Sequence, residues 1–185
     1  MVVLVRDLER LRDQGGRAVV AIEGRCASGK STLAAQIRER LGVPVVHMDD
    51  FFLRPEQRTR ERLARPGENV DHERFLQEVL APLAAGEAPA YRPYSCRTGE
   101  LGVPVALEPS PLVVVEGSYS CHPALWDYYC QRVFLTVNPE EQLQRIEARD
   151  GPEQLKNFRE KWIPMEERYF SAFQVEDRCG YQLEL

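Results

Sequence analysis

Nine residues, 24–32, combine two glycines, a lysine and three hydroxyls in an order that suits the binding of phosphate. They read Gly-Arg-Cys-Ala-Ser-Gly-Lys-Ser-Thr and match the pattern G-x-x-x-x-G-K-[ST] at every fixed position. Glycines let backbone N–H groups turn inward towards phosphate oxygens, and a helix that begins near Lys30 adds positive charge at its N-terminus. The spacing predicts a phosphate-binding loop in which the Lys30 ammonium reaches the terminal phosphates and the Ser31 hydroxyl binds Mg²⁺.

Lysine is scarce in this chain, which makes the lysine of the loop conspicuous. Lys30, Lys156 and Lys161 are the three lysines among 24 lysine and arginine residues. A lysine suits a narrow loop because its ammonium is compact and its stem is flexible, whereas a guanidinium is wide and planar. The expected nucleotide contacts within the loop are Gly24, Ala27, Ser28, Gly29, Lys30, Ser31 and Thr32.

Acidic residues stand at the ends of two apolar segments. Asp49 and Asp50 follow residues 43–48, and Glu116 closes the run that begins at Leu112. If both segments are parallel strands, their ends meet at the edge of the sheet that also carries the phosphate-binding loop. We expect Asp49 to accept the proton of an acceptor hydroxyl and Glu116 to contact a metal ion or its water. We expect Asp50 to cap the following turn.

Apolar runs and helical periods alternate along the chain, which is typical of an α/β protein whose mostly parallel sheet has helices on both faces. The sheet should have about five strands, at residues 17–22, 43–48, 112–117, 132–137 and 181–185. Helices are expected at 4–14, 30–41, from 71 through 80, at 139–149 and at 153–173. Pro82 and Gly86 should end the third helix, and the last helix should bend near Pro164. Residues 89–111 are rich in proline and predict a small β insertion.

Length and composition exclude several other classes of protein. The chain has 185 residues, 43% of them hydrophobic, and a formal net charge of −5. We therefore expect one domain, 1–185, that binds neither nucleic acid nor a membrane, because the chain is acidic and its apolar runs are short. Five cysteines without a Cys-x-x-Cys pair suggest free thiols, and the charged N-terminal segment fits no signal peptide. We expect a cytoplasmic protein.

Four further motifs accompany the phosphate-binding loop. They are Met48-Asp49-Asp50-Phe51-Phe52, Asn69-Val70-Asp71-His72, Glu116-Gly117 and Arg145…Arg149-Asp150. Together with the loop they resemble the uridine kinase-like branch of P-loop kinases, which includes phosphoribulokinase and bacterial pantothenate kinase, over residues 18–170. The resemblance implies a three-layer P-loop NTPase fold. It also implies an enzyme that uses ATP and Mg²⁺ to phosphorylate a hydroxyl of a small molecule, such as a nucleoside or another polyhydroxylated metabolite.

The resemblance also implies roles for individual residues. Asp49 matches the catalytic aspartate of the family and would act with Lys30. Arg145 and Arg149, four residues apart on one helix, resemble arginines of a phosphate-contacting lid, here abbreviated to residues 145–160. We count Arg149 as catalytic and Arg145 as nucleotide-binding. Asp71 matches the acidic residue that holds substrate hydroxyls in uridine kinases. From their positions we also expect substrate contacts by His72, beside Asp71, and by Tyr91 and Arg97 of the β insertion.

Some features leave alternatives open. Cys96 stands where uridine kinases have the histidine of a Tyr-x-x-x-x-His pattern. The arginines of residues 54–65 could be a solvated face, a funnel for an anionic substrate, or the grip of a nucleoside monophosphate kinase on its acceptor phosphate. A regulatory ATPase without an acceptor is a further alternative, and a homo-oligomer stays open. We expect His47 to be a core residue, and His122 has no partners spaced for zinc.

Overall fold

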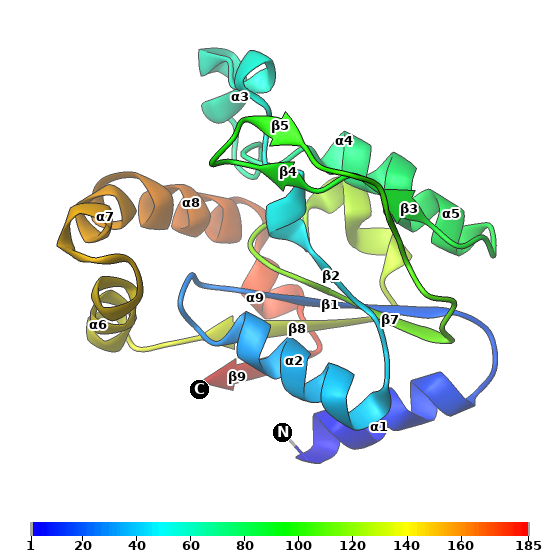
Figure 1. Ribbon diagram of the computed structural model, residues 1–185. Helices are drawn as coiled ribbons and strands as arrows, with labels where there is room; N and C mark the ends of the chain where they lie inside the picture. Colours follow the sequence, from blue (N-terminus) through cyan, green and yellow to red (C-terminus); the bar gives the residue numbers. More distant parts are fainter. Residues whose placement is uncertain (1, 185) are drawn as a thin grey trace.

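Five parallel strands form the central sheet of the described residues, 2–184, in this computed structural model (Figure 1). The strand order is β2-β7-β1-β8-β9, so β1 lies between β7 and β8 at the centre. The predicted α/β class with about five parallel strands is confirmed, while Leu185 of the last predicted strand lies outside the described residues. The strands are β1 (Ala18–Gly24), β2 (Val45–His47), β7 (Leu112–Glu116), β8 (Gln131–Thr136) and β9 (Tyr181–Glu184).

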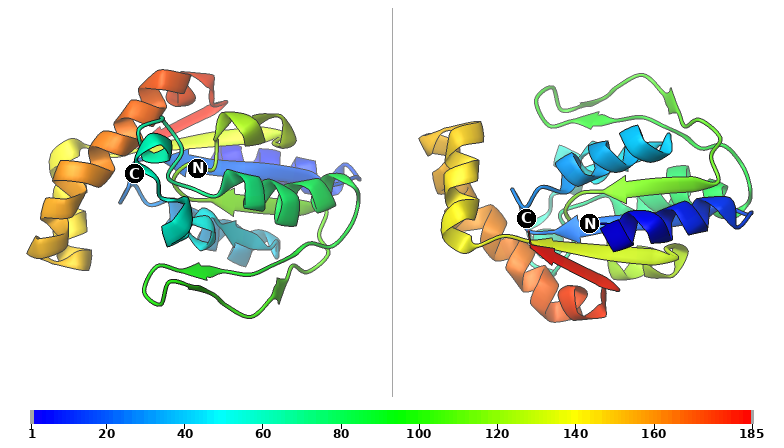
Figure 2. Two further views of the ribbon diagram at one scale, coloured as in Figure 1. Left: turned by 90° about the horizontal axis from the view of Figure 1, so that it is seen from above. Right: turned by 90° about the horizontal axis from the view of Figure 1, so that it is seen from below.

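Helices cover both faces of the sheet, which makes three layers (Figure 2). On one face α1 (Val2–Asp13) and α2 (Lys30–Leu41) pack against Val20 and Ile22. On the other face Val19 and Ala21 meet helices that follow β2 and β8. Alternate residues of a strand point to opposite faces, so a strand that is apolar throughout fills two cores at once.

The second face is covered by two long helices that are each interrupted by a π-helical turn. The first consists of α4 (His72–Phe75), the turn η3 (Leu76–Leu80) and α5 (Ala81–Ala84). The second consists of α7 (Pro152–Asn157), the turn η5 (Phe158–Trp162) and α8 (Ile163–Phe173). The remaining helices are α3 (Arg60–Leu63), α6 (Pro139–Asp150) and α9 (Val175–Arg178), and 3-10 turns lie at η1 (Met48–Phe51), η2 (Pro55–Gln57) and η4 (Pro123–Tyr128).

The same local device precedes a proline in both interrupted helices. The N–H of Ala81 bonds to the Leu76 carbonyl, and the N–H of Ile163 bonds to the Phe158 carbonyl, each across five residues. Such a wide turn makes room for the proline that follows, which has no N–H and clashes with an ordinary helical carbonyl. The prediction that Pro82 ends its helix is therefore wrong.

The predicted β insertion is a hairpin made of two short ladders. The outer ladder pairs β3 (Ala90–Tyr91) with β6 (Val105–Ala106), and the inner ladder pairs β4 (Tyr94–Ser95) with β5 (Glu100–Leu101). The hairpin projects from the layer that holds α4 and α5 (green in Figure 1). Among residues 2–184, no helix combines the length and the apolar character that crossing a membrane would need.

Candidate active site

The phosphate-binding loop joins the end of β1 to the start of α2 at the carboxyl edge of the sheet. Gly24 has a φ of 140°, and a Cβ there would come within 2.0 Å of the Leu135 carbonyl oxygen of β8. Gly29 caps α2 with a φ of 94°, and Ala27 adopts a left-handed φ of 58°. These backbone angles turn successive N–H groups towards one side of the loop, which forms an anion-binding nest.

Lys30 and Ser31 are placed by contacts within and across this loop. The Lys30 Nζ donates to the carbonyl oxygens of Gly24 and Arg25, at 2.7 and 2.8 Å. The Ser31 hydroxyl donates to the Glu116 carboxylate, with distances of 3.2 and 3.3 Å to its two oxygens. The ammonium and the hydroxyl therefore lie on the same side of the sheet edge as the acidic end of β7.

The strand-end carboxylates meet at this edge. Glu116 ends β7, and Asp49 lies in η1 directly after β2. Burial raises the pKa of Asp49, and the charge of Glu116 raises it further. A hydrogen bond from His47 Nδ1 to the same Glu116, at 2.5 Å, raises the pKa of His47. The predicted burial of His47 is wrong, because its side chain is 47% exposed at the end of a short edge strand.

Oxygen donors suited to Mg²⁺ are present here. The Ser31 hydroxyl is already within hydrogen-bond distance of Glu116, and Asp49 borders the same cavity. Mg²⁺ prefers hard oxygen ligands and usually takes one or two carboxylates together with phosphate oxygens. The residues at this edge therefore fit the metal ion that the sequence predicted at Ser31 and Glu116, which stays a prediction.

A cavity of about 840 Å³ opens beside the loop and these carboxylates. Of the residues predicted to contact nucleotide, metal or acceptor, it brings together Ala27, Ser28, Gly29, Lys30, Ser31, Thr32, Asp49, Glu116, Arg145 and Arg149. Sequence reasoning did not assign to the site the other wall residues, which are Cys26, Phe52, Arg58, Asn69, Cys96, Gly117, Ser118, Tyr119, Phe158, Trp162 and Glu166.

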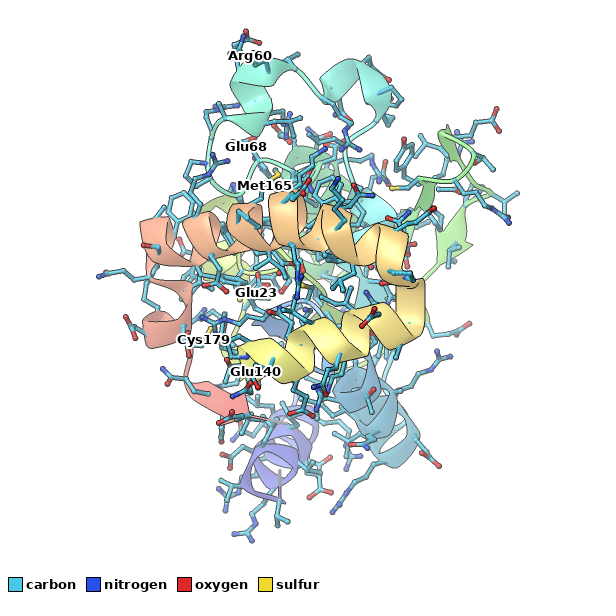
Figure 3. The ribbon with its side chains drawn as sticks, turned by 90° about the vertical axis from the view of Figure 1, so that its left-hand side faces the viewer. Glu23, Arg60, Glu68, Glu140, Met165 and Cys179 are labelled. Atoms are coloured by element: carbon cyan, nitrogen blue, oxygen red, sulfur yellow. The ribbon has the colours of Figure 1, made fainter. Side chains whose placement is uncertain are left out.

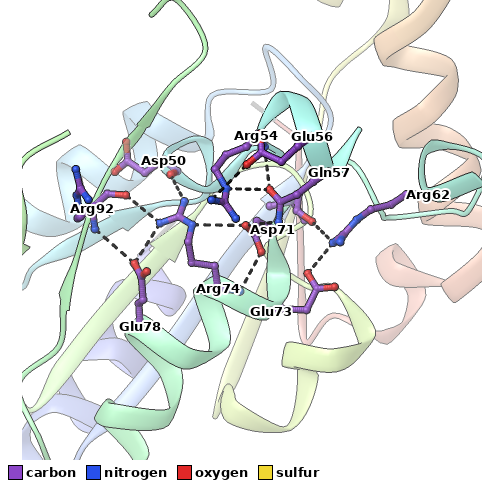
Figure 4. Close-up of polar contacts among 11 residues, drawn as sticks. Asp50, Arg54, Glu56, Gln57, Arg62, Asp71, Glu73, Arg74, Glu78 and Arg92 are labelled. Atoms are coloured by element: carbon purple, nitrogen blue, oxygen red, sulfur yellow. Dashed lines mark hydrogen bonds and ion pairs between the residues drawn. The ribbon is translucent and has the colours of Figure 1, made fainter. Parts of the chain in front are cut away.

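The predicted substrate contact Asp71 is outside the cavity wall and is engaged elsewhere. Its carboxylate accepts hydrogen bonds from the Gln57 side chain at 2.7 Å and from the Arg74 backbone N–H at 3.1 Å, which caps α4 (Figure 4). Arg74 also donates to the Asp50 carbonyl and stacks over the ring of Phe51. Asp71 is thus a buried residue with a structural role. Asn69, two residues earlier in the sequence, does border the cavity.

Three other predicted substrate contacts also lie outside the wall. The Tyr91 hydroxyl donates to the Asp50 carboxylate at 3.3 Å. Asp50 lies within η1 and does not cap the turn that follows, η2, whose N-cap is Arg54. His72 stacks on His122, with ring centroids 3.9 Å apart. Arg97 is exposed at the tip of the hairpin.

Two buried carboxylates accept hydrogen bonds from N–H groups of the phosphate-binding loop, and the sequence analysis missed both. Glu23 is fully buried near the centre of the molecule and accepts hydrogen bonds from Gly24, Tyr119 and Cys121 N–H groups and the Tyr169 hydroxyl (Figure 3). Burial raises its pKa to about 7, although the backbone donors act in the opposite direction. An acidic residue inside an apolar strand was a signal that could have identified Glu23.

Glu166 of α8 is the second of these carboxylates. It accepts a hydrogen bond from the Cys26 N–H at 3.0 Å and another from the Ser118 hydroxyl at 2.5 Å. Arg25 of the loop pairs with the next residue, Glu167, at 2.7 Å. It also pairs with Glu176 of α9 at 3.1 Å. The C-terminal helices therefore anchor the loop, through contacts that span more than a hundred residues of sequence.

The lid arginines reach the cavity from α6. Arg145 donates to the Ala27 carbonyl of the loop at 3.2 Å. Arg149 pairs with Asp150 at 2.7 Å and lies over the ring of Phe158 in η5. Two cationic side chains of α6 therefore border the same cavity as the phosphate-binding loop, and their role as a lid stays a prediction.

A second cluster of polar side chains, Glu68, His72 and His122, has ligand atoms within 4.8 Å of one another. It does not suit a metal ion. His122 Nδ1 accepts a hydrogen bond from the Ala124 N–H at 3.2 Å, so its ring proton is on Nε2 and blocks that nitrogen. The two rings are nearly parallel, at 13°, so their in-plane lone pairs do not converge. Burial lowers the pKa of His122 to about 3, and the neighbouring His72 adds to this shift.

Solved structures share this arrangement of strands and helices. A candidate uridine kinase from Bacillus stearothermophilus is similar with a TM-score of 0.68 and 21% identity, over 98% of this chain and 100% of that one. A candidate fructose transport system kinase from Silicibacter sp. TM1040 has a TM-score of 0.71 and 20% identity, over 98% and 97%. The chain has the P-loop kinase fold. The fold that the sequence resemblance implied is therefore confirmed.

The P-loop kinase fold also extends to a more distant structure. The D-glycerate 3-kinase from Cryptococcus neoformans is similar with a TM-score of 0.64 and 15% identity, over 97% of this chain and 89% of that chain. No family model matches the sequence. The names of these three proteins refer to three different acceptors, which are uridine, fructose and D-glycerate.

Proposed function

We propose that this protein is a small-molecule kinase that uses ATP and Mg²⁺ to phosphorylate a hydroxyl group, and that it works in the cytoplasm as a single kinase domain. The observation that carries the proposal is that one cavity collects the Lys30 ammonium, the Ser31 and Glu116 oxygens and the Asp49 carboxylate. Phosphoryl transfer depends mainly on positioning and on neutralising charge, and these groups supply both. The fold of the similar structures agrees with this class of reaction.

Each group of residues at the cavity would have its own role in the reaction. The nest of the loop and Lys30 bind the phosphates, and Ser31 and Glu116 would hold Mg²⁺, which neutralises phosphate charge when bound. Asp49 orients the acceptor hydroxyl and accepts its proton at a carboxylate oxygen. Arg145 and Arg149 approach from α6, where they bind phosphate oxygens and help to exclude water.

The carboxylate of Asp49 favours a hydroxyl acceptor over the two alternatives from the sequence. A hydroxyl must lose a proton during transfer, whereas an acceptor phosphate is already ionised and needs no base. A regulatory ATPase needs no pocket beyond the nucleotide, yet the cavity extends past Asp49 to Asn69 and Cys96. Nucleoside monophosphate kinase and regulatory ATPase are therefore kept as outcomes of the test.

The test measures ADP release and phosphorylated product across nucleosides, their monophosphates, sugars, sugar acids and vitamins. We expect product from acceptors with a free hydroxyl, and Lys30→Ala should reduce the rate by about 10²- to 10³-fold because one stabilising charge is lost. Lys156→Ala is the matched control, since Lys156 is exposed on α7 and distant in role from the loop. Slow ATP hydrolysis that no panel member accelerates would favour the regulatory ATPase. Transfer to monophosphates alone would favour the other kinase class.

A further inference from the structure

Arg58 is a cationic residue of the cavity wall, and the proposed binding of the nucleotide assigns it no role. The wall contains four cationic side chains, which are Lys30, Arg58, Arg145 and Arg149. Lys30 and Arg145 contact the phosphate-binding loop, and Arg149 pairs with Asp150 beside it. Within residues 2–184, no carboxylate forms an ion pair with Arg58, and its guanidinium lies over the ring of Trp162 at 5.9 Å.

Among the arginines of residues 54–65, Arg58 alone borders the cavity. Arg54 pairs with Glu56, and Arg62 pairs with Glu68 and Glu73. Arg60 is exposed and points away from the body of the molecule, at the top of Figure 3. The arginines of residues 54–65 therefore differ in their surroundings, and Arg58 is the one that borders the cavity.

Arg58 borders the cavity that also contains Asp49. The charges of Arg58 and Asp49 both act on the thiol of Cys96, whose pKa is raised by burial, lowered by Arg58 and raised by Asp49. Cys96 comes from the hairpin, Trp162 from η5 and Arg58 from the segment after η2. Three separate segments thus meet around one guanidinium in the cavity wall, and the lid arginines come from α6.

The groups expected to bind a neutral polyol are meanwhile occupied. Asp71 accepts from Gln57 and Arg74, and Tyr91 donates to Asp50, so neither borders the cavity. Besides Asp49, the cavity wall includes the polar residues Asn69, Cys96 and Arg58. Arg58 is half-buried and forms no ion pair with any described residue. Such a guanidinium is a strong donor to carboxylate and phosphate, which it binds with two parallel hydrogen bonds.

We infer that the acceptor carries an oxyanion, a carboxylate or a phosphate, in addition to the hydroxyl that is phosphorylated, and that Arg58 binds this oxyanion. The inference rests on the proposed kinase function and specifies its substrate class. Arg58 would hold one end of the acceptor while Asp49 receives the hydroxyl at the other, so the guanidinium sets both selectivity and orientation. It would also offset the negative charge that Asp49 and Glu116 place in the cavity.

The experiment compares acceptors that share a carbon skeleton and differ in charge. Ribose, ribonate and ribose 5-phosphate form one series, and glycerol, glycerate and glycerol phosphate form another. We expect kcat/KM for at least one anionic member to exceed that of its neutral counterpart by tenfold or more. Which anion is preferred separates carboxylate from phosphate. Equal or better use of the neutral members throughout would overturn the inference and leave the kinase proposal intact.

Variants of Arg58 test whether this side chain is responsible. Arg58→Ala should raise KM for the anionic acceptor by about 10- to 100-fold, because a hydrogen-bonded charge pair is lost, and should leave KM for ATP unchanged. Arg58→Lys keeps the charge without the planar fork and should recover only part of this loss. Arg60→Ala removes the same charge from an exposed neighbour and should behave as wild type. An equal effect of Arg58→Ala and Arg60→Ala would contradict the assignment.

A binding measurement keeps the test independent of turnover. Because Arg58 lies over Trp162, an anion that binds the guanidinium should change the tryptophan emission, and Trp162→Phe should abolish this signal. Saturable binding of anionic members that Arg58→Ala weakens supports the inference even when no ADP forms, an outcome that would count only against the kinase proposal. Absence of both binding and turnover for every anionic member overturns the inference.

Discussion

The surroundings of Asp49 determine when its carboxylate can accept a proton. Burial raises its pKa, and the nearby Glu116 carboxylate acts in the same direction, whereas Lys30 and His47 partly compensate. A base works only in its deprotonated form, so a raised pKa moves the loss of activity at low pH to higher pH. A raised pKa also strengthens the base, which suits a group that takes a proton from a hydroxyl.

We predict that Asp49→Asn lowers kcat by about 10²- to 10⁴-fold and removes the acidic limb of the pH profile, because the general base is lost. In the wild type, the limb should lie above the ordinary carboxyl value of 3.8, since the pKa of Asp49 is raised. Asp50→Asn is the matched control, because Asp50 accepts from Tyr91 and is not part of the cavity wall. Near-normal turnover of Asp49→Asn with an unchanged pH profile would exclude Asp49 as the base.

At the scale of elements, close backbone approach positions the loop. The end of β1 runs against Leu135 of β8, and only a residue without a Cβ fits at Gly24. The same segment then turns into α2 through left-handed angles at Ala27 and Gly29. The geometry of the nest therefore depends on the pairing of β1 with β8, and not on the loop residues alone.

We predict that Gly24→Ala destabilises the fold by at least about 3 kcal/mol, because backbone strain adds to a direct overlap with the strand. Gly16→Ala is the control: it also imposes a positive φ, of 98°, but its new Cβ would have nothing within 4 Å. This control should cost only about 1–2 kcal/mol, the usual penalty for a left-handed residue. Urea unfolding of both variants measures the difference, and similar losses for the two would refute the role of close approach.

At the scale of the whole molecule, Glu23 connects the sheet, the segment after β7 and α8. Its four hydrogen-bond donors come from Gly24, Tyr119, Cys121 and Tyr169, all in a fully buried setting. Burial raises its pKa from 4.5 to about 7, so the folded protein holds a proton that the unfolded chain releases in this range. Folding stability should consequently fall as pH rises from 4.5 to 7.

The predicted contribution of Glu23 to this loss is up to about 3 kcal/mol, from the size of the pKa shift. In Glu23→Gln this part of the slope should disappear, because the side chain no longer titrates. Glu147→Gln removes the same charge from an exposed site and should keep the wild-type slope. The free energy of unfolding in urea, measured from pH 4.5 to 8, gives both slopes. Parallel slopes for wild type and Glu23→Gln would disprove a buried proton at this residue.

Local patterns determined much of the fold and half of the site. The loop of residues 24–32 could be recognised because its contacts with phosphate depend on consecutive backbone angles and on one helix start. Asp49 and Glu116 could be placed because parallel strands end at one edge. The strands themselves were visible as short apolar runs, since burial on both faces leaves no polar positions.

The tertiary structure alone decided which polar groups remain available for an acceptor. Asp71 looked like a substrate ligand in sequence, yet Gln57 and Arg74 satisfy it. Arg58, one arginine among many, borders the cavity and forms no ion pair with the residues that the structure describes. Glu166 meets Cys26 across 140 residues of sequence. Such partnerships depend on how distant helices pack and on the cost of leaving a buried polar group unsatisfied, and neither is encoded in the spacing of neighbouring residues.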